Sequence, residues 1–245
     1  MRGSVEKKTF LSLMGDKVVE RLGETTKRAS EIEEAKIKSQ YPGCNRIREI
    51  IKDEVFKKTV FERLDDFVEG QITDISIRTS DFGNQLNIVM NDGKEEFILN
   101  INEETSRARS FMKIIPNASP ILPVKIRPWR NDKNKSEGVV LSQEGVKLEY
   151  YFSKDDPKGM PPPPEFASKV PYNEWTPKQK SEYKIYQIRR NEFLVDYLLN
   201  TVAPKFKNVD YSQLPESDDL EVEVKVESEY KPEPAKEPES DDLPF

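Results

Sequence analysis

The chain has 245 residues, of which 35% are hydrophobic and 34% are charged, and its net charge is −6. With so many charged groups, part of the chain must lie outside any hydrophobic core. It contains no histidine and a single cysteine, Cys44, which excludes an internal disulfide, the usual Cys/His zinc sites and every His-dependent catalytic triad. We find no apolar run that could span a membrane and no signal peptide, so we expect a cytoplasmic protein.

Residues 1–65 predict a helical N-terminal extension. A short amphipathic helix is expected at 10–22, followed by an exposed, charge-rich stretch. After a turn at 41–43, Asn45 is expected to cap a second helix. The apolar residues at helical spacing in that second helix are Ile47, Ile50, Ile51 and Val55.

Between residues 66 and 153 the hydrophobic period changes to two, which predicts five strand-like runs, the last of them a hairpin. An Asp92–Gly93 turn joins the second run to the third, and a helix at 104–115 separates the third from the fourth. This is the order of a five-stranded Greek-key barrel, the OB-fold, although a small sandwich or an SH3-like barrel would share most of these signals. The runs are 68–79, 85–90, 96–102, 122–129, and the hairpin of 139–141 and 146–152.

A proline-rich connector and a helix are expected after the barrel. Residues 154–175 hold four consecutive prolines at 161–164 and should form an extended, semi-rigid segment. A helix at 176–206 begins with a capping box of Thr176 and Gln179, with Pro177 at its first position. Its apolar face should pack on the barrel or form a dimer contact. That face consists of Tyr183, Tyr186, Phe193, Leu194, Tyr197 and Leu198.

The candidate DNA-binding residues combine positive charges for the DNA backbone with aromatic rings on which bases stack. They centre on the fourth strand, because residues 125–135 hold five basic residues and one acidic residue. If Val124 and Ile126 point into the barrel, the basic residues beside them point out. A solvated strand face and core aromatic residues are the ordinary alternatives. The candidates are Arg78, Phe82, Lys125, Arg127, Trp129, Arg130, Lys147 and Tyr151.

We expect no enzymatic activity, metal site or cofactor. Pairs of adjacent carboxylates, such as Glu95 and Glu96, point to opposite faces of a strand and cannot converge on one metal ion. The sequence offers no other set of residues that could act together as acid and base.

The acidic tail, residues 207–245, is the last feature. Residues 210–245 hold 13 acidic and 3 basic residues, a net charge of −10, so residues 1–209 carry +4. Few apolar residues and five prolines predict that this tail is disordered. The hexamer Pro-Glu-Ser-Asp-Asp-Leu occurs at 215–220 and again at 238–243, where it runs into Pro244 and Phe245. A terminal phenylalanine with a free carboxylate suits a partner pocket that has a basic rim.

The last five residues, Asp241, Asp242, Leu243, Pro244 and Phe245, resemble the acidic C-terminal tip of bacterial-type single-stranded DNA-binding proteins. The resemblance implies sequence-non-specific binding of single-stranded DNA by the OB-fold. It also implies that the tip recruits replication, recombination and repair proteins. Because extra residues precede the barrel and a helix follows it, the layout looks like a bacteriophage-encoded member that acts in the host cytoplasm. The alternative is a protein-interaction adaptor that uses such a tip to capture the same partners.

Overall fold

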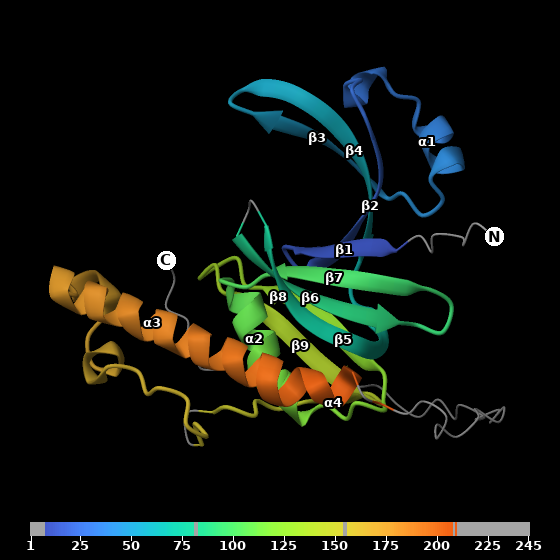
Figure 1. Cartoon of the computed structure of the whole chain (residues 1–245). Helices are drawn as coiled ribbons and strands as arrows, with labels where there is room; N and C mark the ends of the chain where they lie inside the picture. The colour runs from blue at the N-terminus through green and yellow to red at the C-terminus, as the bar shows by residue number, and fades with distance from the viewer. Residues whose placement is uncertain (1–7, 81–82, 154–155, 208, 210–245) are drawn as a thin grey trace, which may run out of the picture.

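In the computed structural model, which describes residues 8–80, 83–153, 156–207 and 209, the chain is mainly β, with one large mixed sheet and a few helices (Figure 1). The strands are β1 (Thr9–Met14), β2 (Lys17–Thr25), β3 (Arg46–Lys52), β4 (Val55–Asp65), β5 (Val68–Ser80), β6 (Gly83–Asn91), β7 (Glu96–Asn102), β8 (Val124–Arg130), β9 (Glu137–Gln143) and β10 (Val146–Lys147). The helices are α1 (Glu34–Gln40), α2 (Ser106–Ile114), α3 (Pro177–Tyr197) and α4 (Ala203–Lys207), with a π-helical segment, Leu198–Val202, between the last two. None of the helices in the described ranges is long and apolar enough to cross a membrane.

The strands follow the order β10-β9-β8-β5-β6-β7-β1-β2-β4-β3. Neighbouring strands are antiparallel, except that β1 and β7 pair in parallel from Thr9 opposite Phe97 to Ser12 opposite Asn100. The long strand β5 pairs with β8 at its start and with β6 over the rest of its length. Because β5 serves both groups of strands, β5 to β9 can enclose one core.

That main core lies between strands β5 to β9, α2 and the C-terminal helices. Its centre is fully buried and includes Ile72, Leu99 and Phe111. The C-terminal helices add Leu194, Leu198, Val202 and Phe206 to the same cluster. The C-terminal helical region is therefore part of the packing of the strand unit.

Strands β2, β3 and β4 extend away from this core together with α1, and we call residues 17–65 the wing (Figure 1). The wing has a small core of its own, formed by Ile37, Cys44 and Phe61. The Tyr41 ring stacks on Phe61 with 5.3 Å between ring centroids. It also lies so close to Gly23 that a Cβ there would come within 2.5 Å of the ring, so only glycine fits under Tyr41.

The predicted helical extension is wrong. Residues 10–22 form the β1–β2 hairpin, which turns at Gly15 with φ +62, and the isoleucines expected on a helix lie in β3. The β3–β4 hairpin turns at Asp53 and Glu54, which both have positive φ. β-Branched residues favour strands, and pairing with distant segments decided between the two periods. The only α-helix described in this region is the short α1.

Several expectations about local structure are confirmed. Gly93 adopts φ +89 in the β6–β7 turn, as the Asp-Gly signal predicted. The capping box of Thr176 and Gln179 is present at the start of α3.

The last predicted strand, 146–152, is much shorter than expected, because β10 contains only Val146 and Lys147.

The proline-rich segment folds back on α3. Trp175 packs against Phe166, Tyr172 and Tyr183, and its indole Nε1 donates a hydrogen bond of 2.8 Å to the carbonyl of Val170. Its aromatic residues therefore share a small cluster with the N-terminal half of α3.

Candidate nucleic-acid interface

Strand β8 places the predicted basic residues as its alternation requires. Val124 and Ile126 are fully buried, while Lys125 and Arg127 lie on the outside of the strand. The Lys125 Nζ lies 2.9 Å from a carboxylate oxygen of Glu69, its cross-strand partner. It also lies 4.3 Å from the ring centroid of Phe67. Lys125 is therefore already paired with an acid and an aromatic ring.

Phe67 is an aromatic residue that the sequence reasoning missed. Its side chain is 39% exposed, and both Lys125 and Arg127 approach its ring, the latter at 6.0 Å. Phe67 directly precedes β5 and was treated as the boundary of the predicted barrel. Strand pairing brings Phe67 beside the basic residues, and no local signal in the sequence predicts this pairing.

An acid neutralises part of the charge around Arg127. Lys17 Nζ lies 2.5 Å from Asp66 Oδ1, and this hydrogen bond is the main reason that the pKa of Asp66 is lowered. The charge of Arg127 lowers it further. Hence the basic side chains of β8 share their surface with two acids from other segments of the chain, Glu69 and Asp66.

Trp129 lies flat against the neighbouring strand. A Cβ on Gly138, its cross-strand partner, would come within 2.9 Å of the indole ring. The ring is half-buried, which leaves one part accessible to solvent. Next to it, Arg130 pairs with Asp132 through a contact of 3.2 Å.

The other candidates are scattered. Arg78 is exposed near the end of β5, and Lys147 is exposed on β10 at one edge of the sheet. Phe82 lies outside the described residues, as do the tip residues Asp241 to Phe245. The structure therefore does not gather the eight predicted residues into one cluster.

The prediction that Tyr151 points outward from a strand is wrong. The segment after β10 is not a strand, so strict alternation fails there, and Tyr150 rather than Tyr151 is exposed. Tyr151 stacks on Tyr197 of α3 with 5.8 Å between centroids and contacts the buried Phe152 edge-on. Burial, with a hydrogen bond to Tyr151, raises the pKa of Tyr197 to about 12. Tyr151 thus belongs to the packing of α3 against the main core.

A polar surface with few charges covers the outside of β6, β7 and β1. Pairing between β6 and β7 sets Asn87 opposite Asn100, and pairing between β7 and β1 sets Asn100 opposite Ser12. Paired residues share a face, so this surface crosses three strands. We call it the outer face, and it consists of Gln85, Asn87, Val89, Ile98, Asn100, Asn102, Phe10 and Ser12. Asn87 and Ile98 are buried on this side, and the other six side chains are half-buried or exposed.

Phe10 is the large aromatic residue of this outer face. Phe10 is 58% exposed, more than any other aromatic residue in the described ranges. It lies opposite Ile98. Phe10 was expected in the helix at 10–22, so its position on the sheet could not be foreseen. An exposed ring beside amide groups can stack a base while the amides donate and accept hydrogen bonds.

The junction between the wing and strands β1, β5 and β7 has an acidic side. A pocket of about 420 Å³ lies there, lined by the ends of strands and by loops. Arg63 is its single basic residue. The acidic lining residues are Asp65, Asp66, Glu69, Asp92 and Glu95. This side would repel the phosphates of a nucleic acid.

Comparisons with protein families, with curated proteins and with solved structures found no match for this chain. No group of three or more Asp, Glu or Cys side chains within the described ranges is arranged to hold a metal ion.

Proposed function

We propose that this chain binds single-stranded DNA without sequence preference, through an OB-fold formed by β5 to β9 with α2. The observation that carries the proposal is the strand order β9-β8-β5-β6-β7, with α2 between the third and fourth strands of the unit. A five-stranded, partly open Greek-key barrel is the fold in which this arrangement is used for oligonucleotides. The packing of α2 against β9, where Ser110 Oγ donates to the Val139 carbonyl at 3.1 Å, supports the same assignment.

In such barrels, oligonucleotides bind on the face of the second and third strands and between two loops. The corresponding strands are β6 and β7, so the DNA would cross the outer face, with Phe10 as a stacking ring. One of the two loops contains the exposed residues Lys133 and Lys135, beside Arg130 at the end of β8. Arg78 lies near the other loop. Bases would contact the amides and the ring, while phosphates would contact the basic loops.

The tail adds a second part to the proposal. Its last residues, Asp241 to Phe245, would recruit replication, recombination and repair proteins, as the resemblance to bacterial-type tips implies. Deleting Phe245 should leave DNA binding intact and abolish binding of purified host replication proteins that recognise such tips. Retained binding of those proteins would remove this part of the proposal.

The DNA-binding proposal is tested by fluorescence anisotropy with a labelled oligo-dT and a matched duplex, at low and moderate salt. We expect tight, salt-sensitive binding that favours the single strand. Phe10→Ala should weaken binding by about 1–3 kcal/mol, the value of one base–aromatic stack. Ile185→Ala, a similarly exposed residue on α3, is the matched control and should bind normally. If the complete chain binds no oligonucleotide, the proposal fails and the adaptor alternative takes its place.

A further inference from the structure

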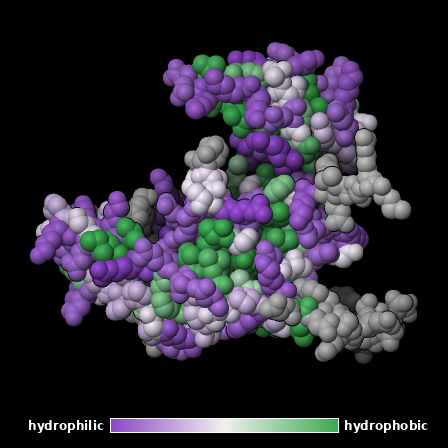
Figure 2. Space-filling view, in the orientation of Figure 1, coloured by the Kyte–Doolittle hydropathy of each residue, from purple (hydrophilic) through white to green (hydrophobic). Residues whose placement is uncertain are grey.

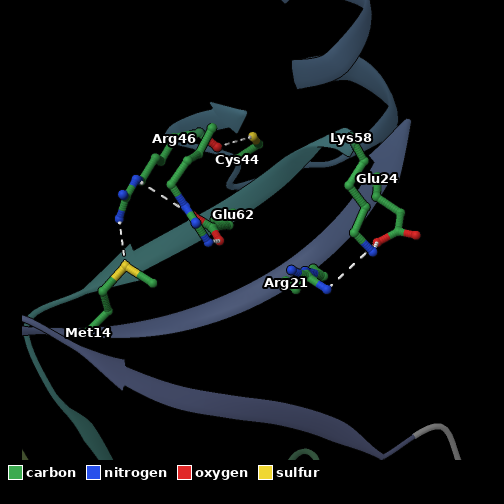
Figure 3. A network of polar contacts seen from close by, with 8 residues as sticks. Met14, Arg21, Glu24, Cys44, Arg46, Lys58 and Glu62 are labelled. Carbon is green, nitrogen blue, oxygen red and sulfur yellow. Dashed lines mark hydrogen bonds and ion pairs between the residues drawn. The ribbon is translucent and has the colours of Figure 1, made fainter. Parts of the chain in front are cut away.

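One face of the wing gathers basic side chains from three strands. Arg46 of β3 and Arg21 of β2 are both cross-strand partners of Glu62 in β4. Cross-strand partners point to the same side of a sheet. Figure 3 shows Arg21, Arg46, Lys58, Glu24 and Glu62 on this one side of the ribbon. We call this set, together with Arg48, the wing face.

Glu62 organises the two arginines of β3. Its side chain is only 2% exposed, and Arg48 binds it with two hydrogen bonds, from Nε at 3.2 Å and from Nη2 at 2.6 Å. Arg46 Nε lies 3.6 Å from the same carboxylate. A guanidinium has five N–H donors, so Arg48 keeps three beyond those bound to Glu62. One buried carboxylate therefore holds two arginines in place while the pair of arginines retains a net positive charge.

A second charged group lies beside the first. Lys58 Nζ lies 2.6 Å from Glu24 Oε2, and Arg21 lies 3.7 Å from the same oxygen. The hydrogen bond from Lys58 is the main cause of the lowered pKa of Glu24. Four basic and two acidic residues thus leave the wing face with a net charge of +2, and none of the six is aromatic.

The wing face continues the outer face of the barrel. Arg46 Nη1 contacts Met14 Sδ at 3.3 Å, and Met14 lies on β1 two residues after Ser12 of the outer face. Alternation along β1 puts both residues on the same side of the sheet. Figure 2 shows a notch between the upper lobe, which is the wing, and the body below it. The opposite side of the wing is covered by α1, which packs on Phe61, and the junction on that side is acidic.

We propose that the wing face is a second phosphate-binding surface, which holds the same DNA strand that crosses the outer face of the barrel. The inference rests on the proposed single-strand binding. Guanidinium groups match phosphate oxygens in pairs, and their fixation by Glu62 lowers the ordering cost of binding. Since the wing face has no aromatic ring, it contacts the backbone of the strand, while Phe10 and the amides of the outer face contact bases.

Two independent charge-removing variants test the proposal. The first is Arg46→Gln with Arg48→Gln and Glu62→Gln, in which glutamine keeps hydrogen-bonding groups and no buried charge is left alone. The second is Arg21→Gln with Lys58→Gln and Glu24→Gln. The matched control on α1 is Lys36→Gln with Lys38→Gln and Glu34→Gln. Every variant lowers the net charge by one, and circular dichroism with thermal unfolding shows which of them are folded.

Binding of an oligo-dT of about 20 nucleotides is measured by anisotropy over a range of salt concentrations. We expect each wing-face variant to bind about tenfold more weakly near 0.1 M salt, and the slope of log K against log salt to fall by about 1.4, the value for two lost single-strand phosphate contacts. The α1 control should match the unmodified chain.

The outcomes separate this inference from the function on which it rests. If the unmodified chain binds oligo-dT and Phe10→Ala weakens it, but folded wing-face variants bind like the control, the wing inference is overturned and the function stands. Wing-face variants that lose duplex binding instead would overturn it as well. If the unmodified chain binds no oligonucleotide, both proposals fail.

Discussion

The wing and the main unit, which is formed by β5 to β9, α2 and the C-terminal helices, are built on one sheet, yet different forces stabilise them. The main unit packs its strands and helices around a large apolar core, with Phe111 and Leu99 fully buried. The wing buries only Ile37, Cys44 and Phe61 in its cluster and carries its charged pairs on the other face. Ion pairs contribute little net stability, either because water screens them or, as at the buried Glu62, because desolvation offsets their attraction. We therefore expect the main unit to supply most of the folding free energy, while the wing uses its residues for a charged surface.

The sharpest test of this contrast is Phe111→Ala in α2. Its ring is fully buried in the main core, so truncation leaves a large cavity and should cost about 3–5 kcal/mol. Urea unfolding followed by circular dichroism measures the loss, which should affect the whole chain. A cost below about 1 kcal/mol would mean that α2 is not an integral part of the core.

Phe61→Ala is the equivalent change in the wing. The ring is 2% exposed, but its cluster is small and open to collapse, so we expect the low end of the range, about 3 kcal/mol. The loss should be local: amide hydrogen exchange should speed up in β3 and β4 and stay slow in β6 and β7. Equal acceleration in both regions would show that the wing and the main unit unfold together.

Gly138→Ala probes how firmly β9 holds Trp129. The added Cβ would lie 2.9 Å from the indole, so the ring must move, at a cost of about 1–2 kcal/mol. The tryptophan emission spectrum should change. Ser142→Ala, on the same strand opposite Lys125, is the control and should leave the spectrum unaltered. An unaltered spectrum in Gly138→Ala would indicate that the indole does not rest on this strand.

We expect the smallest effect on stability from Asp66→Asn, in the short connection between β4 and β5. Because the folded chain lowers the pKa of Asp66 below its ordinary 3.8, the carboxylate stabilises the fold above that pH and ceases to do so as the pH falls through the folded pKa. The unfolding midpoints of the variant and the unmodified chain should therefore converge below pH 3.8. A difference that stays constant between pH 2 and pH 6 would contradict the role of the Lys17 hydrogen bond.

Much of the structure of β5 to β9 could be predicted because its signals are local. Gly93 is needed in the β6–β7 turn for its positive φ, and alternation placed Val124 and Ile126 inside. At Tyr151 the same parity argument failed, because the strand had already ended at Lys147. Alternation is informative only where a strand exists.

The candidate site was harder to predict than the fold. The concentration of basic residues around Lys125 was visible in the sequence, but the acids that offset it lie elsewhere in the chain, Glu69 on β5 and Asp66 between β4 and β5. Phe10 and Phe67 were missed because each becomes part of a surface only through strand pairing. Charge patterns along a chain do not reveal which opposite charges will lie across from them.

By itself, the sequence determined the turn at Gly93, the capped helix after Thr176, the alternation along β6, β7 and β8, and the acidic character of residues 210–245. These features depend on residues that are close together in the chain. Only the tertiary structure decided that most of residues 9–25 and 46–65 form strands, that β1 pairs with β7, and that Glu62 gathers arginines on one face. The physical reason is that the spacing of isoleucine and phenylalanine in these segments fits both a helix and a strand. Hydrogen bonding of their backbone groups to another strand then decides between the two.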